Sequence, residues 1–167
     1  MAQINTKDKE KYPQPMAFPV MIFWTGLFGG VFWGTMGYLA YFLHFIDIRP
    51  NVILLPLALG NWKYGWIGTI VSIIIIGIIS IGVAFIYSAL LKRFNGLWFG
   101  IGYGIVLFAI VFVLLHPLFP DIKPLFELKR DTFITMMCLY MLYGLFIGYS
   151  ISYEYQNKKV QEKEAAT

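Results

Sequence analysis

Four side chains beside two apolar stretches have the types and spacing that could hold a metal ion or exchange a proton. They are His44 and Asp47 in the first segment, and His116 and Asp121 in the second. The segments read Leu-His-Phe-Ile-Asp-Ile-Arg-Pro at 43–50 and Leu-His-Pro-Leu-Phe-Pro-Asp-Ile-Lys-Pro at 115–124, and they contain the only two histidines. Imidazole and carboxylate groups bind zinc and other divalent ions, and histidine titrates near neutral pH. We favour a simpler interpretation, in which the histidines are interfacial anchors and the aspartates are loop charges at a membrane–water boundary.

The elements that must position these residues are indicated by four charge-free stretches. Only 13% of the residues are charged, against about 25% in a soluble domain. The stretches are 12–46, 64–91, 94–120 and 132–153. A helix needs roughly 20 apolar residues to span a bilayer, and a charge at its centre costs about 3 kcal/mol. We therefore predict four transmembrane helices, near 18–45, 65–91, 97–115 and 133–153.

The predicted fold class is all-α, an integral membrane four-transmembrane-helix bundle that forms a single domain over 1–167. The apolar runs are too long and too uniform for transmembrane β-strands. Short polar tails are expected at 1–15 and 154–167. The order of glycines, apolar run, histidine and Asp-Ile-basic-Pro occurs twice. It indicates either two parallel helical-hairpin repeats or convergent composition in glycine-rich membrane helices.

Small residues recur every fourth position in the predicted helices. Those of the first, third and fourth helices are Gly26, Gly30, Gly34, Gly96, Gly100, Gly104, Gly144 and Gly148. A spacing of four places such residues on one helix face, and small residues allow membrane helices to approach closely. Two interpretations stay open. The stripes pack within one bundle, or one stripe faces outward to a second copy or a partner helix.

The distribution of basic residues predicts the orientation. Eight lie in the two tails and the 92–93 turn, and five lie on the other side of the predicted helices. The positive-inside rule then places both termini in the cytoplasm. The bilayer itself is the expected partner, and nucleic acid is not, because no basic folded surface is predicted. Cys138 is the only cysteine, so no intrachain disulfide can form.

The motifs that the chain lacks limit its function. No Asp, Glu, Lys or Arg lies within a predicted helix core, although ion-coupled transporters usually place such groups there. No phosphate loop, Cys-x-x-Cys, His-Glu-x-x-His or Gly-x-Ser-x-Gly occurs, and no cofactor is expected. We predict a non-enzymatic accessory or scaffold protein that acts through helix–helix association. The alternatives are a small oligomeric channel or transporter with the His/Asp cluster at its outer mouth, and an outer-face enzyme with a metal on His44 and His116.

Several segments together resemble a known family. They are the lysine-rich N-terminal tail, the Phe-Trp-Thr-Gly-Leu-Phe-Gly-Gly-Val-Phe-Trp-Gly run at 23–34, the segment at 43–50 and Gly-Tyr-Gly at 102–104. They look like the YqhR family of small conserved membrane proteins from endospore-forming Gram-positive bacteria. The resemblance implies a four-helix integral membrane protein of the bacterial cytoplasmic membrane. It supplies no catalytic residue.

Overall fold

Helices make up all the regular structure in the part of the chain that the computed structural model describes, which is residues 17–56, 60–91, 96–114 and 128–165. The prediction of an all-helical chain is therefore confirmed for these residues. The elements are α1 (Phe18–Phe42), the 3-10 helices η2 (Pro50–Leu54) and η3 (Asn61–Tyr64), α2 (Trp66–Leu91), α3 (Leu97–Ala109), the π-helical turn η4 (Ile110–Leu114) and α4 (Arg130–Ala165).

Three of the described helices, α1, α2 and α4, are long and apolar enough to cross a membrane. The fourth apolar helix, formed by α3 and the turn that follows it, covers only Leu97–Val113. At 1.5 Å per residue this helix is about 26 Å long, whereas the hydrocarbon core of a bilayer is about 30 Å thick. The helix is thus close to the length of a span but falls short of it.

Helix α1 ends at Phe42, three residues before the expected end at residue 45. The amide of Phe45 donates to the carbonyl of Ala40 (2.9 Å), and the amide of His44 donates to that of Tyr41 (3.0 Å). These two bonds form a Schellman motif. His44 has φ 63°, a left-handed conformation that usually favours glycine. A backbone turn therefore ends this helix while the sequence is still apolar.

Helix α4 is longer than expected at both ends. It begins at Arg130 instead of 133 and continues to Ala165 instead of ending at 153. Asp131 lies in its first turn, where a negative charge interacts favourably with the helix dipole. The expected polar tail at 154–167 consists of residues such as Glu, Gln and Lys, which are good helix formers, and its described part continues the helix.

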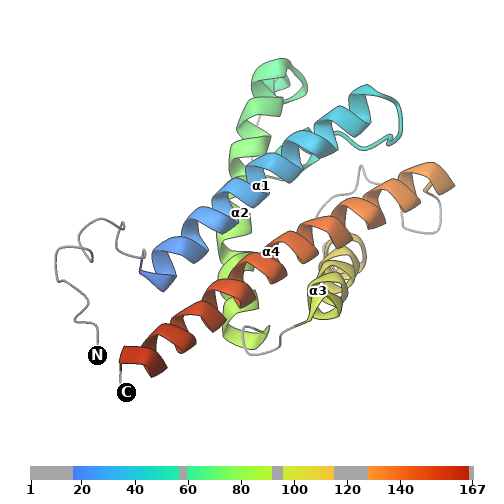
Figure 1. Cartoon of the computed structure of the whole chain (residues 1–167). Coiled ribbons are helices and arrows are strands. Elements are labelled where there is room, and N and C mark those ends of the chain that lie inside the picture. The colour runs from blue at the N-terminus through green and yellow to red at the C-terminus, as the bar shows by residue number, and fades with distance from the viewer. Residues whose placement is uncertain (1–16, 57–59, 92–95, 115–127, 166–167) are drawn as a thin grey trace.

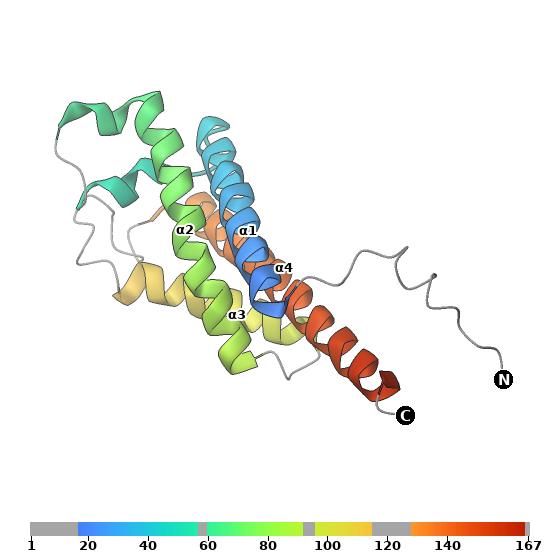
Figure 2. The ribbon, with the colours of Figure 1, turned by 90° about the vertical axis from the view of Figure 1, so that its left-hand side faces the viewer.

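Helices α1 and α4 run antiparallel and lie side by side (Figure 1). At one end, which we call the Phe18 end, the rings of Phe18 and Tyr155 are 5.8 Å apart. At the opposite end, the Asp47 end, the loop after α1 contacts Lys129 and Thr132 where α4 begins. Helix α2 packs mainly on α1 and α3 mainly on α4, and α3 crosses the other helices at a steep angle (Figure 2).

The buried core lies where the helices meet, towards the Phe18 end. Its members, contributed by all four helices, are Ile22, Ala84, Tyr87, Tyr103, Ile147 and Ile151. Tyr87, Ile147 and Ile151 are fully buried. The rings of Tyr87 and Tyr103 meet edge to face with centroids 5.0 Å apart, a favourable arrangement for two aromatic rings. This core joins the α1–α2 pair to the α3–α4 pair.

Candidate functional site

The seam between α1 and α2 is built on the glycines of α1. A Cβ added at Gly26 would lie 2.8 Å from the Cα of Ile81. One added at Gly30 would overlap the Cβ of Ser80 and lie 2.7 Å from the Cα of Gly77. At Gly34 the nearest atom is a side-chain carbon of Ile76 at 3.4 Å, which is an ordinary contact. Gly26 and Gly30 therefore set the closest approach of the two helices.

The seam between α3 and α4 is closer still, because glycines face each other. A Cβ added at Gly104 would overlap the carbonyl oxygen of Tyr140. One added at Gly144 would lie 2.5 Å from the carbonyl oxygen of Gly100. Gly148 faces Gly100 in the same way, with the Gly100 Cα at 2.8 Å from its added Cβ. The two backbones are in direct contact at these positions.

Two glycines differ from the stripes singled out in the sequence. Gly96 precedes α3, and a Cβ there would approach only the ring of Phe99 in that same helix (3.1 Å), so Gly96 makes no close helix–helix contact of the kind seen at Gly100 and Gly104. Gly29 was not singled out, yet it packs against Phe146 and Ile147 of α4. Its position directly before Gly30 hides it when only a four-residue spacing is sought.

A hydroxyl junction joins three helices beside the α1–α2 seam. Ser80 donates to the carbonyl of Gly26 (2.6 Å), and its oxygen also lies 2.5 Å from the hydroxyl of Tyr143. Because the Ser80 proton goes to Gly26, the Tyr143 hydroxyl must be the donor of the second bond. An unsatisfied polar group in lipid costs several kcal/mol. The junction satisfies these groups while tying α2 to α1 and α4.

Two further tyrosines bond across helices in the same region. The hydroxyl of Tyr103 donates to the carbonyl of Val83 (2.7 Å), and that of Tyr87 lies 3.2 Å from the Ser152 oxygen. The glycine spacing gave no sign of these tyrosines. An aromatic residue at helical spacing is hard to distinguish from ordinary apolar filling, because only its partner reveals the role of the hydroxyl.

The His/Asp cluster is only partly covered by the described residues. His44 is exposed at the turn after α1, and Asp47 is exposed three residues later. His116 and Asp121 lie outside the described residues. In the part of the chain that the structure describes, no three His, Cys, Asp or Glu side chains lie close enough to hold a metal ion. The metal hypothesis for the four residues thus stays a prediction.

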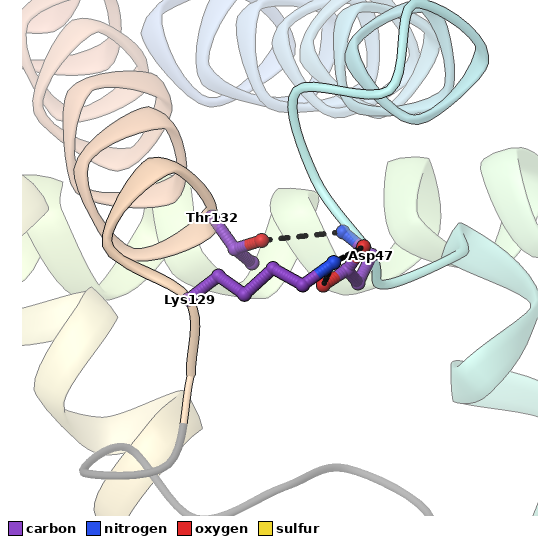
Figure 3. A network of polar contacts seen from close by, with 3 residues as sticks. All are labelled: Asp47, Lys129 and Thr132. Atoms are coloured by element: carbon purple, nitrogen blue, oxygen red, sulfur yellow. Dashed lines mark hydrogen bonds and ion pairs between the residues drawn. The ribbon is translucent and has the colours of Figure 1, made fainter.

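Asp47 contacts two residues where α4 begins: Lys129, directly before the helix, and Thr132, within it. Its carboxylate pairs with the ammonium group of Lys129 (3.1 Å), and its backbone amide donates to the hydroxyl of Thr132 (3.3 Å) (Figure 3). Both charged side chains are more than half exposed, so their ion pair contributes at most about 1 kcal/mol. Its main effect is to place the loop after α1 against the start of α4.

Asn51 fastens the loop between α1 and α2. It is buried, and its amide group donates to the carbonyls of Lys63 (2.7 Å) and Gly65 (3.3 Å). Its side-chain oxygen accepts a bond from Thr69 in the first turns of α2 (3.0 Å). An asparagine within an apolar loop was the available signal for this role. The contacts hold η2 and η3 together at the start of α2.

In its described residues the chain is thus an all-helical protein with three helices that could span a membrane, and glycines allow close packing within each of its two helix pairs. The family model for the conserved membrane protein YqhR matches residues 2–166. An uncharacterized protein YqhR from Bacillus subtilis (strain 168) is 50% identical over 161 residues, which cover 96% of this chain and 90% of that protein. The chain belongs to the YqhR family, as its sequence motifs predicted. No solved structure matches it.

Proposed function

We propose that this chain is a non-enzymatic accessory or scaffold protein of the bacterial cytoplasmic membrane, acting through helix–helix association with a second copy or another membrane protein. The interior supports this proposal, because glycines and hydroxyl groups there are engaged in contacts between the helices. What remains available on the described helices is their outer apolar surface. Partner recognition in lipid depends on close packing at such a surface.

The outer face of α2 around Gly82 carries the proposal. A Cβ added at Gly82 would meet nothing within 4 Å, in contrast to those at Gly26 and Gly30. Large exposed residues flank the position one turn away on either side, namely Ile78, Ile79, Phe85 and Ile86. Gly82 thus forms a notch between bulky side chains. A helix of a partner could approach the backbone there without disturbing the fold of this chain.

A photocrosslinking experiment in membranes tests this surface. With a benzophenone amino acid at exposed Phe85, we expect one crosslinked product of fixed mass. Gly82→Leu fills the notch and should lower its yield at least fivefold, because the partner backbone can no longer approach. Ile78→Leu keeps the volume of the same face and should leave the yield unchanged. No product in the otherwise unsubstituted chain, or an equal yield from Gly82→Leu, would contradict the proposal.

We further propose that α3 and the turn η4 form a fourth crossing, so that both termini lie in the cytoplasm. Support comes from the proximity of Phe18 and Tyr155, since helices α1 and α4 then begin and end on one side. In each helix pair the glycines of the first helix face the second helix, which also supports two related hairpins. The basic residues in the tails favour the cytoplasm for the Phe18 end.

Cysteine accessibility tests this topology. In a Cys138→Ser background, a membrane-impermeant maleimide should label Lys63→Cys in intact cells. It should label Lys7→Cys and Lys159→Cys only after permeabilisation, because an even number of crossings returns the chain to the same side. Labelling of Lys7→Cys and Lys159→Cys from opposite sides would mean three crossings and contradict the proposal.

A further inference from the structure

Arg49 is held in a fixed position at the Asp47 end. It precedes Pro50, and its backbone is extended (φ −83°, ψ 147°), as the clash with a following proline ring requires. Its side chain folds back onto the last turn of α1. There the Nε–H group donates to the hydroxyl of Tyr41 at 2.5 Å, and the guanidinium carbon lies 4.9 Å from the centre of the Tyr41 ring. Both the backbone and the side chain of Arg49 are thus oriented before any ligand binds.

The two terminal nitrogens of Arg49 remain available. The nearest acid in the sequence, Asp47, pairs with Lys129 instead, and no carboxylate among the described residues pairs with Arg49. A guanidinium group has five N–H donors, of which Nε supplies one. The other four form the planar fork that binds a phosphate group through two parallel hydrogen bonds.

The surroundings of Arg49 match the level of lipid headgroups. Tyr41 belongs to the last turn of α1, so the guanidinium group lies at the end of a candidate membrane span. The exposed aromatic residues Trp62 and Tyr64 lie in η3, and exposed Trp66 is the first residue of α2. Asn51 bonds this segment to the loop that follows Arg49. Exposed Trp and Tyr side chains are typical of the membrane interface.

Charge favours an anionic ligand at this end. Its described basic residues are Arg49, Lys63, Lys129 and Arg130, and its described acidic residues are Asp47 and Asp131. We propose that Arg49, oriented by Tyr41, binds the headgroup phosphate of an anionic phospholipid. This inference does not depend on the proposed scaffold function. It concerns a charged contact with a lipid headgroup, whereas the scaffold function depends on close packing against another helix.

Native mass spectrometry of the full chain in detergent tests this site. The probes are phosphatidylglycerol and phosphatidylcholine with identical acyl chains. We expect about a tenfold preference for phosphatidylglycerol, since its headgroup keeps a net negative charge for charge-assisted bonds with Arg49, whereas the phosphate of phosphatidylcholine is balanced by its own choline cation. Arg49→Gln should reduce the preference to within twofold. Arg49→Lys should recover only part of it, because an ammonium group keeps the charge and loses the fork.

Matched variants distinguish lipid binding at Arg49 from a general attraction of anionic lipid to the basic residues of this end. Arg130→Gln removes an exposed basic residue of the same end and should leave the preference unchanged. Tyr41→Phe keeps the ring, removes the hydrogen-bond acceptor and should give an intermediate value. An unchanged preference in Arg49→Gln, or equal losses in Arg49→Gln and Arg130→Gln, would overturn the proposal, provided that circular dichroism shows both variants folded. Displacement of the lipid by millimolar inorganic phosphate would also overturn it, by identifying a soluble anion as the ligand.

Discussion

Gly104→Ala is expected to separate α3 from α4 and to lower the free energy of unfolding by about 3 kcal/mol, at the upper end of the overpacking range. The new methyl group would overlap the carbonyl oxygen of Tyr140 and lie 2.8 Å from the Cα of Met141. Backbone atoms cannot rotate away as a side chain can. The helices must therefore move apart, and the contacts around Gly144 would be lost with them. Unfolding in mixed micelles, followed by circular dichroism, measures the change.

Gly102→Ala is the matched control for this experiment. It lies two residues away in the same helix, and a Cβ there meets nothing within 4 Å. Alanine favours helix more than glycine by roughly 1 kcal/mol, so this variant should be as stable as the natural chain or slightly more stable. Equal losses in Gly104→Ala and Gly102→Ala would mean that the seam does not limit stability.

Gly30→Ala is expected to have the second largest effect, a loss of about 2 kcal/mol through overpacking of the α1–α2 seam. Its methyl group would overlap the Cβ of Ser80 and lie 2.9 Å from the carbonyl oxygen of Ile76. A shift of α2 away from α1 would also stretch the bond from Ser80 to Gly26. The same denaturation experiment measures the loss.

Gly37→Ala serves as the control in α1, since a Cβ at that position also meets open space. It should change the unfolding free energy by less than about 1 kcal/mol, the typical difference in helix propensity between glycine and alanine. A stable Gly30→Ala protein with unchanged unfolding would show that α1 and α2 can pack in another register.

The helix boundaries show where sequence patterns are sufficient. Helix-breaking residues mark the starts of α1 and α3, where Pro19 and Gly96 lie, and charge exclusion from lipid predicts the end of α2, which Lys92 follows in the sequence. It misses the end of α1, where the turn at His44 interrupts an apolar run. It also misses the end of α4, because Glu, Gln and Lys continue a helix in water as readily as apolar residues do in lipid.

The candidate site residues likewise include some that a sequence pattern predicts and some that it does not. A spacing of four residues is enough to single out Gly30 and Gly104, because it depends only on helix geometry. Helix spacing does not predict which polar side chains contact each other. Asp47 forms an ion pair with Lys129, which is distant in the sequence, and Arg49 donates a hydrogen bond to Tyr41. These contacts depend on the path of the loop after α1, which folds back over the helix ends. No local sequence pattern predicts that path.

The contact between the loop at Asp47 and the start of α4 has a consequence for biosynthesis. Asp47 and Thr132 are 85 positions apart in the chain, so a nascent chain must expose nearly all its apolar segments to the insertion machinery before this contact can form. The α1–α2 pair can assemble as soon as α2 leaves the ribosome. The contacts between α1 and α4 can form only after α4 has been synthesised. Until α4 is made, the face of α1 around Gly29 that α4 later covers stays open to lipid.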